Sequence, residues 1–594
     1  MSSFYDDASL VVIPSGYKTS KVYSEKPTDG SGDLAFTRTG DTATRVASNG
    51  LIEKVRTNLV LQSNTFSTTW TNVNSTETSG QAGYDGTNNA WLLTDNATNG
   101  IHVLRQTPST TGLVTLSVYA KAGTLNWMFL RGVQSSANVR AWFNLSTGTI
   151  GTVDANGTAK MESVGNGWYR CSLTIANMQS GFEVYIATAS GDNVEGYIGS
   201  GQSIVIQNCQ YEQGDIATDY IPTTTAAVSV GPVSNVPRLD YLGSSCPRLL
   251  LEPQRTNLAL YSENFDNAAW TKTNTTATAN AATSPDGYTN AESILDNSTS
   301  GQHRVENAIS SSIATGQTVA ISFFAKKNTH DWCQVTSGGQ TNDQWASFNL
   351  ATGAVGNTSA SANAKIENYG NGWYRLSIAA TTTANNAILA SIFSLTNNTN
   401  ANTRSPSYVG TGGGVYIYGA QIEAGSYASS YVNTLSASVT RVADAASKTG
   451  ISSLIGQTEG TIFLDFVYDA ENTANERFSI SDGTSAKRIF VVINTSKLLS
   501  FTCTNAGSDQ WNISTSLTVG QRYKIAGAYK ANDIALYVNG VQIGTDAAAS
   551  IPDCSNLYFA NESGTTQEWN NPTSQLLLFK TRLTNAQLAE LTTL

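Results

Sequence analysis

The chain contains one module twice. The motif Arg-Thr-Asn-Leu at residues 56–59 returns at 255–258, and the hexapeptide Gly-Asn-Gly-Trp-Tyr-Arg at 165–170 returns unchanged at 370–375. Other matched positions follow in unbroken order: Phe66 with Phe265, His102 with His303, Gln210 with Gln421 and Tyr220 with Tyr431. A repeat of this length indicates a duplicated domain, and the small changes in spacing are insertions of the kind that surface loops tolerate.

Both copies consist of short apolar segments with a period of two, bounded by Gly, Asn and Asp. Examples lie at 113–119 in the first copy and 319–324 in the second. Short strands at regular spacing are typical of β-sandwiches and jelly rolls. The segment 534–544 predicts a further hairpin around an Asn-Gly turn, and 584–591 predicts a short helix that starts with a capping box. We therefore predict an all-β chain: tandem duplicated jelly-roll β-sandwiches followed by a third sandwich.

The predicted domain boundaries follow from changes in composition along the chain and from the repeat. They are 1–55 for an N-terminal head piece, 56–222 for repeat 1, 223–254 for a Pro-rich connector, 255–433 for repeat 2, 434–458 for a linker and 459–594 for the last domain. The head piece has little core of its own. It is either a segment that attaches the chain to a partner or an extended arm of the next domain.

Charge and cysteine content narrow the class of protein. Only 13% of the residues are charged and the net charge is −10, so we expect no nucleic acid partner. No apolar run reaches the ~18 residues that span a bilayer, and the N-terminus lacks a secretory signal, so we expect no membrane insertion and synthesis in a cytoplasm. Cys171 and Cys209 face Leu and Ala in the other copy, which favours buried hydrophobes; Cys503 and Cys554 are an open candidate for a disulfide.

Several motifs resemble known families. The start at 56–59, the Tyr-Ala-Lys strand at 119–121, the turn at 165–170 and the end at 210–214 resemble the carbohydrate-binding-module-like jelly rolls of bacteriophage head-spike and tail-fibre proteins. The segments 536–540 and 579–588 resemble a concanavalin A-like (laminin G-type) lectin sandwich.

The resemblance implies a virion-surface fibre or spike, on head or tail, assembled in the host cytoplasm. It implies capsid or tail proteins as partners through the N-terminus, and a homo-oligomer with a trimer favoured. Sandwiches of both kinds often hold calcium, and Asp85 and Asp286 are candidates, although turn formation explains them as well. We expect no other cofactor.

The chemistry that we expect is sugar binding rather than catalysis. The sequence has no His-Glu-x-x-His, Gly-x-Ser-x-Gly or Walker motif, and the matched His102 and His303 favour a structural role, so we expect no enzyme. Flat aromatic rings cover the apolar faces of sugars. The candidates for this are Trp127, Trp142, Trp332, Trp345, Trp511 and Trp569. The repeated turn assigns structural roles to Trp168, Arg170, Trp373 and Arg375.

These expectations combine into a structural and adhesive protein that binds host-surface glycans. Two alternatives stay open: a polysaccharide depolymerase tailspike, and a purely architectural decoration of the virion.

Overall fold

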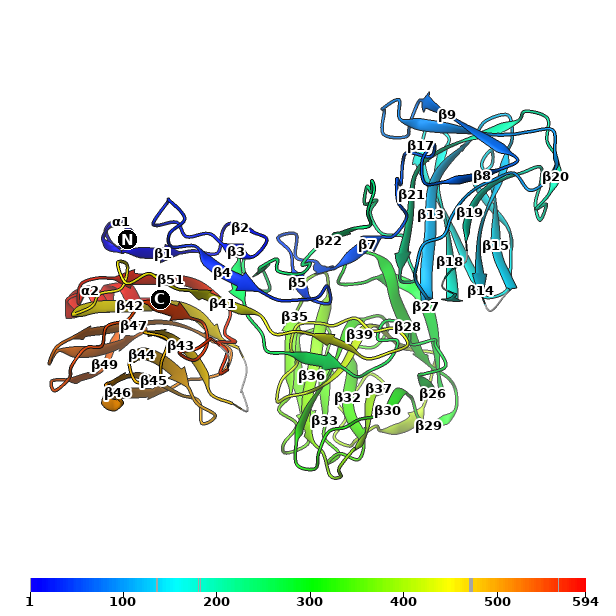
Figure 1. Ribbon diagram of the computed structural model, residues 1–594. Helices are drawn as coiled ribbons and strands as arrows, with labels where there is room; N and C mark the ends of the chain where they lie inside the picture. The colour runs from blue at the N-terminus through cyan, green and yellow to red at the C-terminus, as the bar shows by residue number, and fades with distance from the viewer. Residues whose placement is uncertain (1, 135–136, 180, 182, 470–473, 565) are drawn as a thin grey trace. The chain divides into compact units, whose positions relative to one another are not determined.

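The computed structural model describes residues 2–134, 137–179, 181, 183–469, 474–564 and 566–594. Strands hold 51% of the chain and helices 2%, which confirms the all-β prediction (Figure 1). The chain divides into two compact units, Val55–Gly231 and a larger unit that combines Met1–Lys54 with Pro232–Leu594. Among the described residues, no helix has both the length and the apolar character needed to cross a bilayer.

Repeat 1 is a jelly roll made by one antiparallel sheet that folds into two layers. The layers have the orders β16-β15-β14-β19-β12-β8 and β9-β10-β21-β13-β18-β17. The strands are β7 (Arg56–Asn58), β8 (Thr71–Val73), β9 (Ser75–Gln81), β10 (Ala90–Asp95), β11 (Asn99–Gly100), β12 (Val103–Gln106), β13 (Gly112–Ala122), β14 (Trp127–Gln134), β15 (Ala137–Asn144), β16 (Thr149–Val153), β17 (Gly157–Gly165), β18 (Trp168–Met178), β19 (Val184–Ala189), β20 (Tyr197–Ile198), β21 (Ser203–Gln213) and β22 (Val228–Val230).

The core of repeat 1 follows from the two-residue period of its strands. Leu116 on β13 pairs with Leu173 on β18, and both are fully buried, while Leu104, Ile186 and Leu130 form a matching row on the opposite layer. Successive side chains of a strand point to opposite faces, so each layer has a core side and an outer side. The first strand, β7, pairs with the last, β22, which closes the module.

Repeat 2 has the same architecture. Its two six-stranded sheets have the orders β26-β30-β37-β32-β33-β34 and β27-β28-β39-β31-β36-β35, and its own apolar core includes Phe323, Phe348 and Phe393. The strands are β25 (Arg255–Asn257), β26 (Thr271–Thr273), β27 (Thr275–Thr283), β28 (Thr289–Asp296), β29 (Ser300–Gln302), β30 (Arg304–Ser310), β31 (Thr318–Lys327), β32 (Trp332–Gly339), β33 (Trp345–Asn349), β34 (Ala354–Thr358), β35 (Lys365–Asn368), β36 (Trp373–Thr381), β37 (Ile388–Leu395), β38 (Ser407–Val409), β39 (Gly414–Ala424) and β40 (Val439–Arg441).

The C-terminal sandwich packs an eight-stranded sheet against a nine-stranded one. Its own strands are β41 (Ala445–Lys448), β42 (Glu459–Tyr468), β43 (Glu476–Ser481), β44 (Arg488–Ile493), β45 (Leu498–Asn505), β46 (Ser508–Ser516), β47 (Gln521–Lys530), β48 (Ile534–Val538), β49 (Val541–Asp546), β50 (Asn556–Tyr558) and β51 (Thr573–Phe579). The predicted Asn-Gly hairpin joins β48 to β49, and α2 (Asn585–Thr592) begins with the predicted capping box at Thr584.

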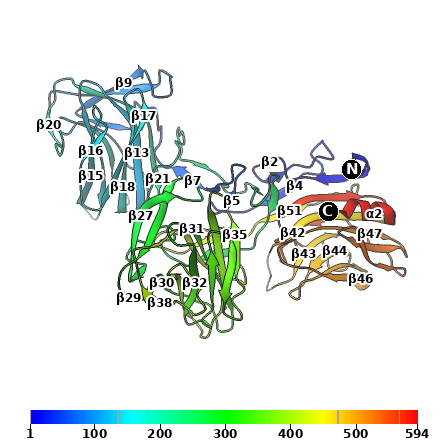
Figure 2. The ribbon, with the colours of Figure 1, turned by 180° about the vertical axis from the view of Figure 1, so that it is seen from behind.

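The head piece belongs to this sandwich. It contains α1 (Ser2–Asp7), β1 (Leu10–Val12), β2 (Tyr17–Lys18), β3 (Lys21–Val22) and β4 (Leu34–Thr37). β1 pairs with β51, with Leu10 opposite Leu578, and β4 pairs with β41 (Figure 1). Phe4 of α1 and Leu588 of α2 share one apolar cluster, so both chain ends lie on the same sandwich (Figure 2). The head piece is therefore part of the core of the last domain.

A hairpin precedes each jelly roll, and the two hairpins pack on different neighbours. The first is β5 (Thr44–Val46) with β6 (Ile52–Lys54), and the second is β23 (Arg238–Asp240) with β24 (Arg248–Leu250). The second hairpin extends the eight-stranded sheet of the C-terminal sandwich through the pairing of β24 with β51. The first packs on repeat 2, where Ile52 joins an apolar cluster of that module.

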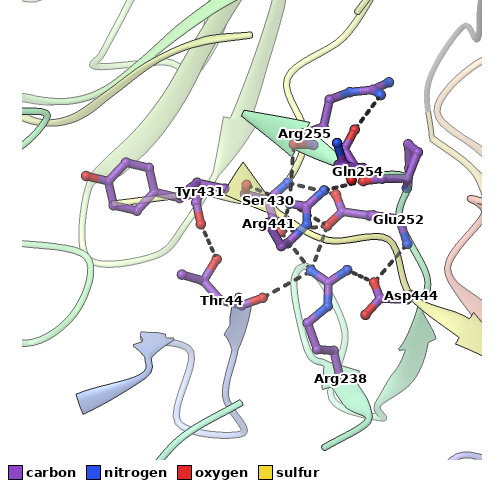
Figure 3. A network of polar contacts seen from close by, with 12 residues as sticks. Thr44, Arg238, Glu252, Gln254, Arg255, Ser430, Tyr431, Arg441 and Asp444 are labelled. Atoms are coloured by element: carbon purple, nitrogen blue, oxygen red, sulfur yellow. Dashed lines mark hydrogen bonds and ion pairs between the residues drawn. The ribbon is translucent and has the colours of Figure 1, made fainter. Parts of the chain in front are cut away.

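A buried ionic network joins these segments (Figure 3). Arg238 in the connector contacts Glu252 at 2.6 Å and also Asp444 in the linker, and Arg441 contacts Glu252 at 3.1 Å. Arg38 of the head piece contacts Asp444 at 3.1 Å. Burial alone would raise the pKa of Glu252, but the guanidinium groups of Arg441 and Arg238 hold it well below its usual range. The network fixes head piece, connector and linker to one another.

Candidate functional site

A surface that combines arginine, carboxylate and aromatic side chains lies on repeat 1; its aromatic rings are buried and its charged side chains reach solvent. On the strands β12, β19, β14 and β15, the side away from the core carries two rows of side chains in register, which we call the outer face. The first row is Val103, Ala187, Phe129 and Trp142, and the second is Arg105, Tyr185, Arg131 and Arg140. The alternation that buries Leu104, Ile186 and Leu130 places both rows on the outer side.

The guanidinium groups of the outer face lie over aromatic rings. Arg131 lies 4.2 Å from the centre of the Tyr185 ring, and Arg140 lies 5.2 Å from that of Trp142. Glu195, from the loop before β20, contacts Arg131 at 3.3 Å and Arg140 at 2.7 Å. These contacts hold both guanidinium groups over the aromatic rings at distances typical of cation–π interactions.

Carboxylates accompany each of the three arginines. Asp154 contacts Arg140 at 2.7 Å, and this hydrogen bond raises the pKa of the guanidinium. Glu183 contacts Arg105 at 2.9 Å and accepts a hydrogen bond of 3.0 Å from the Tyr185 hydroxyl. The six charged side chains, including Glu195, are between 16% and 37% exposed, so solvent reaches them.

This surface has the chemistry of a sugar-binding site. Guanidinium N–H groups donate hydrogen bonds, carboxylates accept them, and planar groups accept the C–H face of a pyranose ring. The opposite charges balance, three against three, so the surface favours hydroxyl groups over a highly charged ligand. The rings of Tyr185 and Trp142 lie beneath the arginines, which form the exposed layer.

The matched face of repeat 2 differs at every chemically important position. Gln334, Thr336, Trp345, Ser347 and Ile392 stand where repeat 1 has Phe129, Arg131, Arg140, Trp142 and Tyr185. Gln334 donates to Ser347 and to the carbonyl of Thr403, so much of this face is engaged internally. The two modules have equivalent cores and differ on this surface. The fold therefore does not require the side chains that repeat 1 has here.

Three of the predicted sugar-stacking tryptophans are buried, and the prediction that they present a ring to a sugar is corrected. Trp142 and Trp569 have no exposed surface, and Trp511 retains 3%. Trp142 lies under Arg140 and donates to the carbonyl of Val194 at 3.2 Å, while Trp569 packs against Phe466 in the C-terminal core. A ring without an exposed face cannot stack on a sugar.

The other three candidates are partly exposed. Trp127 and Trp332 occupy matched positions and each packs against a glycine: a methyl group added at Gly151 would lie 2.7 Å from Trp127, and one added at Gly356 would lie 2.5 Å from Trp332. Trp345 lies on the outer side of repeat 2, in register with Thr336. Trp127 lies on the same side of β14 as Phe129 and Arg131 and packs against the apolar cluster beneath the outer face, so it belongs to that surface of repeat 1.

The repeated turn holds its tryptophans in the interior. Trp168 and Trp373 are buried, and the glycines before them, Gly167 and Gly372, have φ of 76° and 79°, a backbone region that favours glycine. The arginines bridge strands to loops: Arg170 donates to the carbonyl of Thr218 at 2.5 Å, and Arg375 to that of Ser429 at 2.5 Å.

His102 and His303 are held by matched backbone contacts, and five of the six cysteines are buried. The ring nitrogens of His102 lie 2.7 Å and 3.1 Å from the carbonyl oxygens of Asn74 and Tyr197. His303 repeats these contacts with Asn274 and Tyr408. All six cysteines are free, so Cys503 and Cys554 do not form a disulfide.

The candidate calcium ligands do not fit a metal ion. The carboxylate of Asp286 lies 2.8 Å from the ammonium group of Lys54, which occupies the position a cation would take. Asp85 closes its own turn by accepting from the backbone and hydroxyl of Thr87. Among the described residues, no group of three or more His, Cys, Asp or Glu side chains gathers as a metal site.

A second cluster of arginine and aromatic groups lies on the C-terminal sandwich. Arg477 and Arg488 lie 4.3 Å and 4.8 Å from the centre of the Phe490 ring, and both contact Glu562 at 2.8 Å. These charged side chains are only 11% to 18% exposed. The cluster therefore ties the loop of Glu562 to the sheet and offers less surface than the outer face of repeat 1.

Comparison with known proteins agrees with the fold of the last domain. Residues 465–589 match the family described as the concanavalin A-like lectin/glucanases superfamily. A search of the curated proteins found no match to this sequence. The chain therefore combines a concanavalin A-like, lectin-type domain with two jelly-roll sandwiches.

The solved structures to which parts of the chain are similar include carbohydrate-binding modules and a laminin. The CBM40 module of the Ruminococcus gnavus IT-sialidase, bound to α2,3 sialyllactose, is 14% identical with a TM-score of 0.22, over 25% of this chain and 91% of its own. The CBM22-1–CBM22-2 tandem of Paenibacillus barcinonensis Xyn10C is 11% identical with a TM-score of 0.21, over 65% and 98%. Domains LG4-5 of the mouse laminin α1 chain are 9% identical with a TM-score of 0.16, over 48% and 85%.

The residues that define the outer face, above all Arg131, Tyr185 and Glu195, were not among the sequence candidates. The predicted sugar-binding residues were all tryptophans, and these three residues are of other types. The signal was present in the alignment of the copies: Arg131 faces Thr336, and Tyr185 faces Ile392. A position that the shared core does not require is the better candidate for function.

Proposed function

We propose that this chain is an adhesive surface protein of a bacteriophage particle, a fibre or spike of head or tail, and that it binds host-surface glycans without cleaving them. The observation that carries glycan binding is the outer face of repeat 1. There Arg105, Arg131 and Arg140 lie in one row with their carboxylate partners and reach solvent, and Arg131 and Arg140 lie over aromatic rings.

The composition of the chain and its lectin-type domain support the same proposal. Ser, Thr, Asn and Gly provide most of the polar surface, since only 13% of the residues are charged. The segment 465–589 belongs by sequence to a superfamily whose description includes both lectins and glucanases. Weak sites of this kind become effective when an oligomer presents several of them, and we propose a homo-oligomer, with a trimer favoured.

We propose that the N-terminal part of the chain attaches it to the particle. A groove of 740 Å³ lies beside α1 and is lined by Tyr5, Asp6, Ser9, Val11, Ile13, Glu25, Lys26, Pro27, Thr28 and Asp29. Because β1 pairs with β51, we propose that the head piece and the C-terminal sandwich together form the mount for capsid or tail proteins. Repeat 1, which has its own core, then provides the principal glycan surface.

Glycan binding is tested with an array of bacterial surface polysaccharides and full-length protein. The double variant Arg131→Ala/Arg140→Ala removes the two guanidinium groups, and Thr336→Ala/Trp345→Ala changes the matched positions of repeat 2 as a control. We expect the first variant to lose at least tenfold in affinity for the bound glycan and the second to stay within twofold. Equal binding by the first variant and the native chain would reject the outer face as the site.

The depolymerase alternative has a separate readout. Glycoside hydrolysis uses two carboxylates flanking the scissile bond. On the outer face Asp154, Glu183 and Glu195 are each in an ion pair with an arginine. We expect no new reducing ends when the protein is incubated with the polysaccharide that it binds, and their steady release would favour the enzyme. A purely architectural role predicts no glycan binding on the array and normal assembly of the protein into particles.

A further inference from the structure

The other layer of each repeat carries a second surface, and in repeat 2 the chain itself covers it. Ile52 of the first hairpin is buried in a cluster with Phe324, Trp373, Tyr418 and Tyr431. Its backbone N–H donates to the carbonyl of Pro285 at 2.9 Å.

The covering hairpin is also held by charge. The ammonium group of Lys54 lies 2.8 Å from both Glu263 and Asp286, and it donates to the Tyr418 hydroxyl at 2.8 Å. Burial would lower the pKa of Lys54, but Asp286 and Glu263 raise it. This surface of repeat 2 is therefore a receptor for an apolar residue followed two positions later by a lysine.

Repeat 1 lacks that receptor at the matched positions. Asn64 stands in place of Glu263 and Gln207 in place of Tyr418, so one carboxylate and the phenol that hold Lys54 are missing. Tyr84 stands in place of Pro285. Its ring stacks on Tyr119 with centres 4.0 Å apart and an angle of 9° between the planes, and it packs on the apolar cluster that contains Trp168.

The surface around Tyr84 is open within repeat 1. Asp286 is 3% exposed beneath the hairpin, whereas the matched Asp85 is exposed to solvent. A methyl group added at Gly287 would lie 2.7 Å from Leu51, but one added at the matched Gly86 would meet nothing within 4 Å. Tyr84 itself is partly exposed.

Polar groups in fixed positions surround the Tyr84 ring. Gln207 donates to Asp85 at 3.0 Å and also to Asn89, and it accepts from the backbone N–H of Tyr84 at 3.0 Å. Asn208 donates to the Tyr84 hydroxyl at 3.1 Å. We call Tyr84, Asp85, Asn89, Gln207 and Asn208 the Tyr84 face.

We propose that the Tyr84 face is a second carbohydrate-binding site, separate from the outer face, and that it takes a neutral pyranose. The tyrosine ring offers a surface for the C–H face of the sugar. The side-chain amide of Asn89 and the carboxylate of Asp85 form hydrogen bonds with the sugar hydroxyls. The exposed carboxylate of Asp85 disfavours an anionic sugar, and the changes at Asn64 and Gln207 disfavour a lysine-bearing hairpin.

Saturation-transfer NMR on the full-length chain tests this proposal. The probes are methyl β-glucopyranoside, methyl β-galactopyranoside and methyl N-acetyl-β-glucosaminide at millimolar concentration, with a synthetic peptide of residues 43–55 as the alternative ligand. We expect at least one glycoside to bind. Tyr84→Ala should weaken it tenfold or more, Asn89→Ala several-fold, and Tyr84→Phe less than twofold because the ring remains. Tyr23→Ala, which removes a tyrosine that is 38% exposed elsewhere, should change nothing.

The outcomes separate this proposal from the outer face. Loss of binding in Tyr84→Ala with retention in Arg131→Ala/Arg140→Ala supports the Tyr84 face even if the outer face fails on the array. Unchanged binding in Tyr84→Ala and Asn89→Ala, no glycoside binding by the native chain, or binding of the peptide in place of the glycosides would overturn it. Asn89→Ala keeps the aromatic stack, so its repeat 1 should melt at the native temperature. An unchanged thermal transition shows that a loss of binding in this variant is not caused by unfolding.

Discussion

Arg238 and Asp444 form an ion pair in the protein interior although 206 residues separate them in the chain. One side chain comes from the connector before repeat 2 and the other from the linker after it. Because Arg38 and Glu252 join the same network, the ends of several segments meet at one buried point. Ser430, near the end of repeat 2, bonds Glu252 and Arg238, so the network joins the two ends of the inserted module to the rest of the larger unit.

Removal of one member of this network should destabilise the larger unit. In Asp444→Ala, Arg238 and Arg38 lose a carboxylate while they stay buried, and breaking a buried pair in this way costs about 3–5 kcal/mol. Differential scanning calorimetry should show a lower transition temperature for the larger unit and an unchanged one for repeat 1. The control is Glu53→Ala, whose pair with Arg45 is partly exposed, with an expected cost of about 0–1 kcal/mol. Equal effects of the two substitutions would contradict this account of the network.

The head piece should contribute directly to the stability of the C-terminal sandwich. Leu10 has no exposed surface and belongs to the same core as Leu576 and Leu578. Leu10→Ala should therefore lower the stability of that sandwich by about 2–5 kcal/mol. Denaturant unfolding and, separately, differential scanning calorimetry measure this loss of stability. The neutral control is Ile198→Ala, because the side chain of Ile198 is 70% exposed. An unchanged melting temperature of the sandwich in Leu10→Ala would show that the head piece does not contribute to its stability.

Glu476 should make the stability of the C-terminal sandwich fall as pH rises. Burial raises the pKa of this carboxyl to about 8, from an ordinary value of 4.5, and Asn571 donates to it at 2.5 Å. Between these two values the folded state keeps a proton that the unfolded state has released, so the free energy of unfolding decreases as pH increases from 4.5 to 8. Melting temperatures of the native chain and Glu476→Gln across this range test the effect. The variant should lose this part of the pH dependence, and parallel curves for both proteins would contradict it.

Much of the fold follows from patterns within the sequence. The repeat and the two-residue period predicted the paired sandwiches, and local turn chemistry predicted the hairpin at Asn539 and the start of α2 at Thr584. The pairing of Leu10 with Leu578 could not be predicted, because alternation decides which side of a strand is buried but not which strand lies beside it. The head piece therefore looked separate in sequence although its strands complete the last domain.

The site was less predictable than the fold. Trp142 was favoured because the second copy has Ser347 at its position; it lies on the proposed surface, but its ring is buried beneath Arg140. Arg131 meets Glu195 only because a loop folds back onto the sheet, and no local pattern encodes that approach. Differences between the copies located the face, and three-dimensional structure was needed to assign its parts.

The most direct test of the central claim is a crystal structure of the full-length protein soaked with the oligosaccharide that it selects on the array. Glycan binding by the outer face predicts sugar density within hydrogen-bonding distance of Arg131 and Arg140, with Glu195 or Asp154 accepting from its hydroxyls. Sugar bound only to the C-terminal sandwich or to repeat 2, with the outer face of repeat 1 left bare, would contradict it.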